Sequence, residues 1–154
     1  MLRTVLVLVA IVAGCGGGGG SPAAPPGDGP AFSPAIANQL RAIAPNCKFE
    51  RVNAAASRTC TGIHGKVQIA LQQERFTTLV IEMPSKILSE AKTHFGNALR
   101  GVFDAAGLES VIVAMSKLET GARTDLTIGS AKVGLAAGGT SRIAPAYSIE
   151  VTWN

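Results

Sequence analysis

Histidine, the side chain most often used as a general base or transition-metal ligand, occurs only twice in this chain of 154 residues, at His64 and His94. His94 follows Glu90 by four residues, so on a helix the two share one face and could supply two metal ligands. Spacing suggests no third ligand, and Glu/His pairs are common on helix surfaces. His64 stands between Ile63 and Gly65, which is typical of a turn. We therefore predict no metal site and no cofactor.

The segment Ser89-Glu90-Ala91-Lys92 has the Ser-x-x-Lys spacing in which a lysine activates a serine nucleophile in penicillin-interacting enzymes. The companion Ser-Asp-Asn and Lys-Thr-Gly motifs of those enzymes are absent from the sequence. The sequence also lacks a Gly-x-Ser-x-Gly elbow, a His-Glu-x-x-His zinc motif and an acidic calcium loop. We therefore predict no catalytic residues and expect a protein that is not an enzyme.

The first residues have the layout of an export signal. Arg3 supplies a positive charge, and residues 4–13 form an apolar segment rich in Val, Leu, Ile and Ala. This segment is shorter than the about 20 apolar residues that a spanning helix needs. It ends in Val12-Ala13-Gly14-Cys15, which resembles the lipobox of bacterial lipoproteins. The resemblance is limited to residues 1–15.

The lipoprotein resemblance implies a signal peptide at residues 1–14, cleavage before Cys15 and attachment of diacylglycerol to the Cys15 thiol. Several acyl chains would anchor the protein stably in a membrane. Gly16, which takes the place of an acidic residue after Cys15, implies the outer membrane by the sorting rule of enteric bacteria, facing the periplasm or the cell surface. A conventional signal peptide cut elsewhere is the alternative.

The other two cysteines predict a disulfide. Lipidation of Cys15 would leave Cys47 and Cys60 as a pair in an oxidising compartment. Closing a loop of this length stabilises a fold by about 3 kcal/mol in the chain-entropy model. A metal or redox role is the alternative, but twelve residues separate the two cysteines and none of them is a histidine.

Composition divides the rest of the chain in two. Residues 15–32 are rich in Gly and Pro, with Asp28 as the single charge, and predict a lipid-anchored, disordered linker. Its five consecutive glycines lack the lysine and Ser/Thr that a phosphate-binding loop requires. Residues 33–154 have the usual size of one globular domain.

Local patterns predict two helices and a series of strands. Ser33 as N-cap and Pro34 at the first position open a helix that ends near Ile43. A second, long helix extends over 85–106, with Ser85 as N-cap and Gly107 as its stop. Strands are predicted at 48–53 and 59–63, flanking a turn at 54–57, then at 67–71, 76–83, 125–137 (broken at Gly129) and 147–153. Residues 109–118 fit a helix or a strand, and we favour the helix.

These elements predict an α+β fold of two layers, an antiparallel sheet of about five to six strands with the long amphipathic helix on one face. The apolar stripe of that helix, which includes Phe95 and Leu99, would cover the sheet. The other sheet face would stay open to solvent or serve for docking. It would carry Gln68, Gln72, Glu82, Ser148, Glu150 and Thr152.

The net charge of +4 raises the possibility of a polyanionic partner. Export argues against nucleic acid, and the open sheet face lacks the aromatic side chains that stack bases. Basic residues gather in and beyond the first predicted hairpin and could meet anionic lipid headgroups, or could form an ordinary solvated edge. These residues are Lys48, Arg51, Arg58 and Lys66.

The sequence therefore predicts a non-enzymatic envelope lipoprotein that binds a protein or envelope component through the open sheet face or the basic hairpin. Candidate contacts are Gln68 and Glu150, the four basic residues, and Arg142 in a loop at 138–142. One alternative is a cell-wall or lipid enzyme whose site has no recognisable motif. Another is an inhibitor or immunity-type protein whose 138–142 loop plugs a partner.

Overall fold

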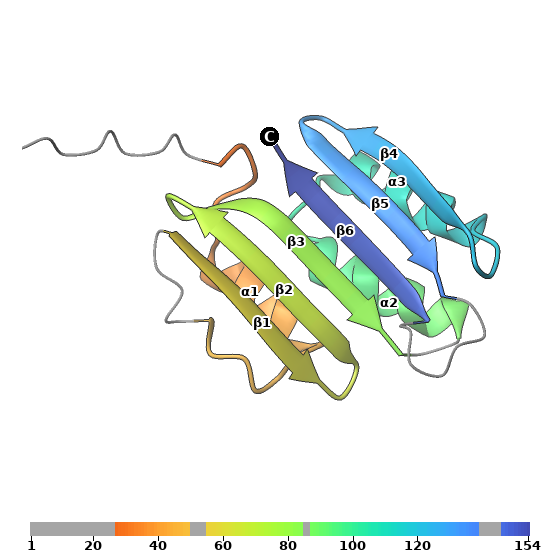
Figure 1. Ribbon diagram of the computed structural model, residues 1–154, viewed down its shortest axis with the longest axis horizontal. Helices are drawn as coiled ribbons and strands as arrows, with labels where there is room; N and C mark the ends of the chain where they lie inside the picture. Colours follow the sequence, from red (N-terminus) through yellow and green to blue (C-terminus); the bar gives the residue numbers. More distant parts are fainter. Residues whose placement is uncertain (1–26, 50–54, 85–86, 139–145) are drawn as a thin grey trace, which may run out of the picture.

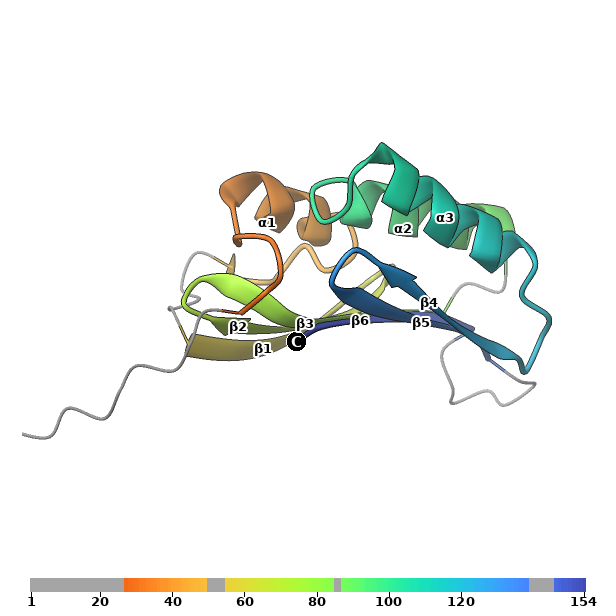
Figure 2. The same cartoon turned by 90° about the horizontal axis from the view of Figure 1, so that it is seen from above.

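The computed structural model describes residues 27–49, 55–84, 87–138 and 146–154. These residues form a six-stranded antiparallel sheet with helices packed on one of its faces, so the α+β class is confirmed (Figure 1 and Figure 2). The helices are α1 (Pro34–Arg41), α2 (Leu88–Leu99) and α3 (Ala105–Ser116). The strands are β1 (Ala55–Gly62), β2 (Gly65–Gln72), β3 (Arg75–Met83), β4 (Arg123–Ile128), β5 (Ala131–Ala137) and β6 (Tyr147–Trp153).

The sheet is built from two three-stranded meanders. Its strand order is β1-β2-β3-β6-β5-β4, and every neighbouring pair is antiparallel. The meanders join where β3 pairs with β6, and α2 and α3 connect them in the chain. The central strands are therefore the last strands of the two meanders, while β1 and β4 form the edges.

Alternation of side chains explains the strands that local patterns predict well. In β2, Val67, Ile69 and Leu71 are buried and the residues between them are half-buried. The predicted hairpin of residues 67–71 with 76–83 is confirmed as β2–β3, and the strand at 147–153 as β6. The broken strand at 125–137 is the β4–β5 hairpin, which turns at Gly129 with φ +58°.

The predicted first hairpin is wrong. Residues 55–57, expected in a turn, lie in β1, and β1 pairs with β2 through a two-residue turn at Ile63 and His64. Lys48 lies outside any strand, and residues 50–54 lie outside the described residues. The alanines at the start of β1 have low intrinsic strand preference, so pairing with β2 holds them extended.

The single long helix is also wrong, because α2 ends at Leu99 and α3 begins at Ala105. The backbone N–H of Gly101 donates to Gln39 Oε1 of α1 at 3.1 Å. Asp104 then starts α3 as its N-cap, its carboxylate accepting from the N–H of Gly107 at 2.8 Å.

Gly107 is thus in the first turn of α3, although its sequence position suggested a stop. The helix favoured for residues 109–118 is confirmed as the main part of α3. Ser85, the expected N-cap of the long helix, lies outside the described residues, and α2 begins at Leu88. The N-cap of α1 is confirmed, since the Oγ of Ser33 accepts from the N–H of Ile36 at 3.3 Å.

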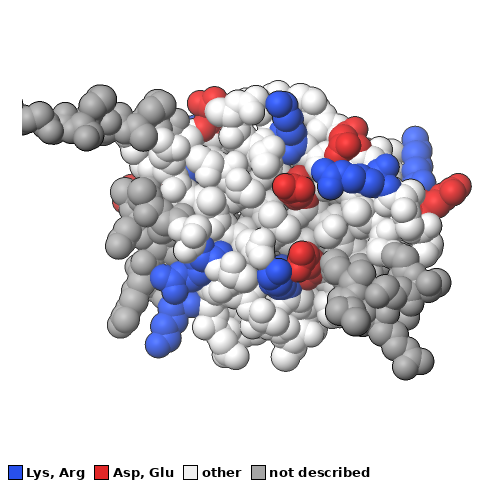
Figure 3. Space-filling model, in the orientation of Figure 1, with Lys and Arg blue, Asp and Glu red and all other residues white. Residues whose placement is uncertain are grey.

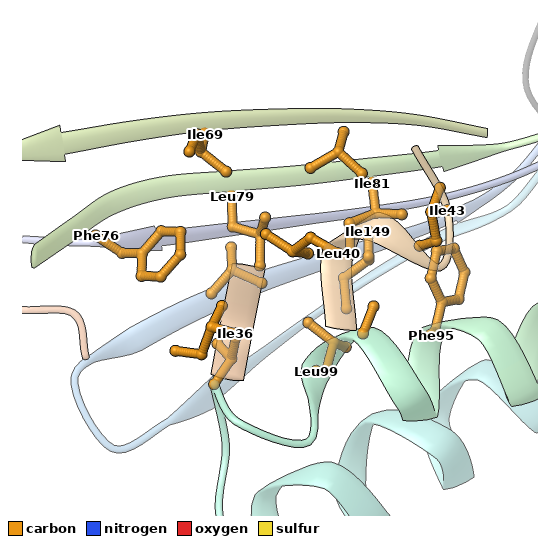
Figure 4. Packing of buried hydrophobic residues seen from close by; sticks show 14 of the residues in the cluster. Ile36, Leu40, Ile43, Ile69, Phe76, Leu79, Ile81, Phe95, Leu99 and Ile149 are labelled. Atoms are coloured by element: carbon orange, nitrogen blue, oxygen red, sulfur yellow. The ribbon is translucent and has the colours of Figure 1, made fainter. Parts of the chain in front are cut away.

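The hydrophobic core lies between the helices and the sheet. Leu79 and Ile81 of β3 and Leu40 of α1 are fully buried, as are Phe95 and Leu99 of α2. Figure 4 shows these side chains converging from both layers. A cluster of this size stabilises the fold by the hydrophobic effect, at about 25 cal/mol per Å² of apolar surface removed from water.

A disulfide ties the loop after α1 to the edge strand. Cys47 and Cys60 are bonded, with their Cα atoms 5.5 Å apart, as the cysteine pairing predicted. Cys60 pairs in register with the buried Val67, so its side chain points to the helix side of the sheet.

Among the helices of the described residues, none combines the length and apolar character needed to cross a bilayer.

Candidate functional site

One face of the sheet has the helices on it, and no helix of the described residues covers the other, which we call the open face (Figure 2). Strand alternation sends every second side chain to the open face. Gln68 of β2, Val80 of β3 and Glu150 of β6 are adjacent in register there. Gln68 and Glu150, the two contacts proposed from sequence, therefore lie on one surface.

Cross-strand register arranges the open face in rows that cross all six strands. The middle row is Thr59, Gln68, Val80, Glu150, Gly134 and Asp125. A neighbouring row is Thr61, Lys66, Glu82, Ser148, Ala136 and Arg123. On the other side of the middle row are Ser57, Ala70, Thr78, Thr152, Lys132 and Thr127.

Charges of both signs lie close together on the open face, as Figure 3 shows. On β2 and β3, Lys66 Nζ lies 3.1 Å from Glu82 Oε2, and both side chains are about one-third exposed. On the opposite half, Arg123 Nε donates to Asp125 Oδ1 at 3.1 Å. Exposed or half-exposed pairs of this kind contribute about 0–1 kcal/mol to stability, so the fold does not depend on them.

Arg123 lies across β5 and reaches β6, with its Nη2 3.6 Å from Glu150 Oε2. Gly134 lies beneath this side chain. A Cβ at Gly134 would stand 3.0 Å from both Arg123 Cζ and Asp125 Oδ1, closer than side chains normally pack. The missing side chain at Gly134 therefore makes room for the guanidinium to meet two carboxylates from different strands.

A shallow hollow of about 380 Å³ lies on this part of the open face. Its lining includes Thr127 and Thr152, whose hydroxyls can both donate and accept hydrogen bonds. Four charged side chains also line the hollow: Arg123, Asp125, Lys132 and Glu150. The hollow can thus recognise a polar group of either charge.

Of the four basic residues proposed from sequence, the three that the structure describes do not form one patch. Lys66 lies on the open face, while Arg58 pairs in register with the buried Ile69 and so points to the helix side. Arg58 Nε is buried and has no hydrogen-bond partner among the described residues. Lys48 is exposed in the loop after Cys47. Cys15, Arg51 and Arg142, with most of the 138–142 loop, lie outside the described residues.

The residues that the sequence analysis considered for catalysis or metal binding lie on α2 or beside it. Ser89 is exposed in the first turn of this helix, and Lys92 is half-buried one turn later. The rings of His64 and His94 are stacked, with their centroids 4.6 Å apart. Sequence reasoning missed this contact, because the two histidines are 30 positions apart in the chain.

Two further hollows lie outside the open face. One, of about 390 Å³, is lined by aromatic and apolar side chains near the start of α1, including Phe32, Phe49 and Leu71. The other, of about 540 Å³, lies between α3 and the edge strand β4, beside Val113 and Leu126. Neither includes a residue proposed from sequence.

The contribution of β4 and β5 to the open face was not predicted from sequence. Its signal was present in the second half of β4, where Asp125 and Thr127 alternate with the apolar Leu126 and Ile128. Comparisons with protein families, with curated proteins and with solved structures find no match for this chain.

Proposed function

We propose that this protein is a lipid-anchored, non-enzymatic binding module of a bacterial cell envelope whose open face docks a protein partner. The observation that carries the proposal is a wide polar surface with balanced charge on the helix-free side of the sheet. In the three rows described above, its charged side chains are three cations and three anions: Lys66, Arg123, Lys132, Glu82, Asp125 and Glu150. Mixed charges in a fixed pattern fit a partner whose own charges alternate.

Charge balance favours a protein over a polyanion. A phosphate-rich surface would be matched by an excess of Lys and Arg, whereas here Lys66 pairs with Glu82, and Arg123 pairs with Asp125 and Glu150. The outward positions of the described strands carry no aromatic side chain, so stacking on bases or sugar rings has no platform there. Hydroxyl groups of Thr59, Thr127 and Thr152 add hydrogen-bonding capacity without net charge.

The membrane anchor in this proposal rests on the first fifteen residues. A basic start, an apolar segment and Val12-Ala13-Gly14-Cys15 support export, lipidation at Cys15 and placement at the outer membrane. We expect labelled palmitate to be incorporated into the full-length protein in its host, and Cys15→Ala to abolish the labelling. Undiminished labelling of Cys15→Ala would contradict the anchor while leaving the docking proposal untouched.

Docking is tested by the size of the complex that the full-length protein forms in envelope membranes after mild detergent extraction. We expect Glu150→Lys to raise the dissociation constant of the complex at least about tenfold, equivalent to about 1.4 kcal/mol, and so to lower the fraction in the larger complex. The reason is that it places a cation beside Arg123 and removes one carboxylate from the hollow.

Asn97→Lys is the matched control, because Asn97 is exposed on α2 and lies on the helix side of the molecule. It adds a cation without touching the open face, and we expect the complex to persist. Loss of the complex in Asn97→Lys with retention in Glu150→Lys would assign docking to the helices and refute the proposal.

A further inference from the structure

We propose that His64 and His94 form a binding site for a divalent first-row transition-metal ion. They are the only histidines of the chain, and they come from the β1–β2 turn and from α2. Their rings are stacked with centroids 4.6 Å apart and planes inclined by 27°. This proposal is independent of docking at the open face.

The backbone holds His64 in place opposite α2. Two glycines, Gly62 and Gly65, pair with each other and close the two-residue turn that carries it. A Cβ at Gly62 would stand 2.5 Å from the Cα of Ala44. Gly65 has φ +155° and packs against the carbonyl of Glu82 so closely that a side chain there would collide with it.

The segment after α1 and the strand β3 therefore support the turn from two sides. The Cys47–Cys60 disulfide fixes β1 two residues before Gly62. His94 lies in the middle of α2, and the next residue of this helix, Phe95, is fully buried in the core. Both imidazoles are thus presented from supported backbone, so little ordering is needed when an ion binds.

Imidazole is a preferred ligand of Zn²⁺, Cu²⁺ and Ni²⁺, at about 2.0–2.1 Å for zinc. His64 is exposed and His94 half-buried, so water and ions reach the pair. The rings face one another, so a shared ion requires each ring to rotate about its side-chain bonds until one of its nitrogens points to the ion. Glu90, one helical turn before His94, adds negative charge to the same helix face.

The site is a two-imidazole site completed by water. Among the described residues, no group of three or more His, Cys, Asp and Glu side chains is placed to hold a metal ion. Affinity should follow the usual order of divalent ions for nitrogen ligands, with Cu²⁺ above Ni²⁺ and Zn²⁺. Because an ion held by both rings joins the hairpin tip to α2, it binds the folded state more tightly than the unfolded chain and raises the stability of the fold.

The experiment is a titration of ZnCl₂ into the untagged, full-length protein with its disulfide intact, followed by calorimetry and by thermal unfolding. We expect one ion per chain and a rise in Tm that a chelator reverses. His64→Gln and His94→Gln should each weaken Zn²⁺ binding at least tenfold, and the loss in the double variant should be smaller than the sum of the two single losses, because both rings serve one ion.

Lys92→Gln is the control, because it changes a polar side chain of α2 and leaves both rings in place. Its Zn²⁺ affinity should match that of the wild type. Imidazole NMR signals of the unaltered protein give a readout that needs no variant: both rings should shift together at one equivalent of Zn²⁺. Wild-type affinity in either histidine variant, or a shift of only one ring, would overturn the proposal.

Discussion

The two faces of the sheet are made by the same strands and differ in almost every property. In β3, Leu79 and Ile81 point to the helices and are fully buried. Thr78, Val80 and Glu82, which alternate with them, are half-buried on the open face. Apolar burial on one face supplies the stabilisation, so the sequence of the other face is free to serve recognition.

The largest expected effect compares neighbouring residues of β3. Ile81→Ala should lower the free energy of unfolding by about 2–5 kcal/mol, because it removes buried methyl groups and leaves a cavity. Val80→Ala, on the open face, should cost less than about 1 kcal/mol. Urea unfolding of both variants measures the two values. Equal losses would mean that the open face contributes to the core as much as the helix face does.

The disulfide sharpens the comparison, because it lies on the helix side of the sheet. Replacing Cys47 and Cys60 together by Ser should lower the free energy of unfolding by about 3 kcal/mol, since the unfolded chain regains the freedom of the closed loop. Thermal or urea unfolding under oxidising conditions measures this change. A variant as stable as the wild type would show that packing alone holds β1 to the loop after α1.

A smaller effect on stability is expected from replacing two aspartates, one in the helix layer and one on the open face of the sheet. Asp104→Ala should cost about 1 kcal/mol, because it removes the N-cap bond to the N–H of Gly107 in the helix layer. Asp125→Ala on the open face should change stability by less than about 0.5 kcal/mol, because its pair with Arg123 is exposed. Chemical unfolding compares them, and a larger loss for Asp125→Ala would contradict the assignment of stability to the covered face.

Local sequence patterns predicted the elements that neighbouring residues determine, and missed those that depend on contacts between distant parts of the chain. Alternation defined β2, β3 and β6, and Ser33 with Pro34 defined the start of α1. The division between α2 and α3 was missed, because the apolar stripe continues to the buried Val102. What separates the helices there includes a bond between Gly101 and Gln39, residues 62 positions apart, which no local pattern reveals.

The candidate sites divide in the same way. Gln68 and Glu150 could be assigned to one surface from strand alternation alone. The group of Arg123, Gly134 and Glu150 depends on the register of three strands, and register is set by pairing across the sheet. The stacking of His64 on His94 likewise needs the β1–β2 turn to lie beside α2.

The most direct test of the central claim is photo-crosslinking in the native envelope. A photoreactive amino acid is placed at Gln68 or Glu150 on the open face, or at Asn97 on α2, in the full-length protein. Our account predicts one dominant protein adduct from both open-face positions and none from Asn97. Adducts from Asn97 alone, or the absence of protein adducts at Gln68 and Glu150, would contradict docking through the open face.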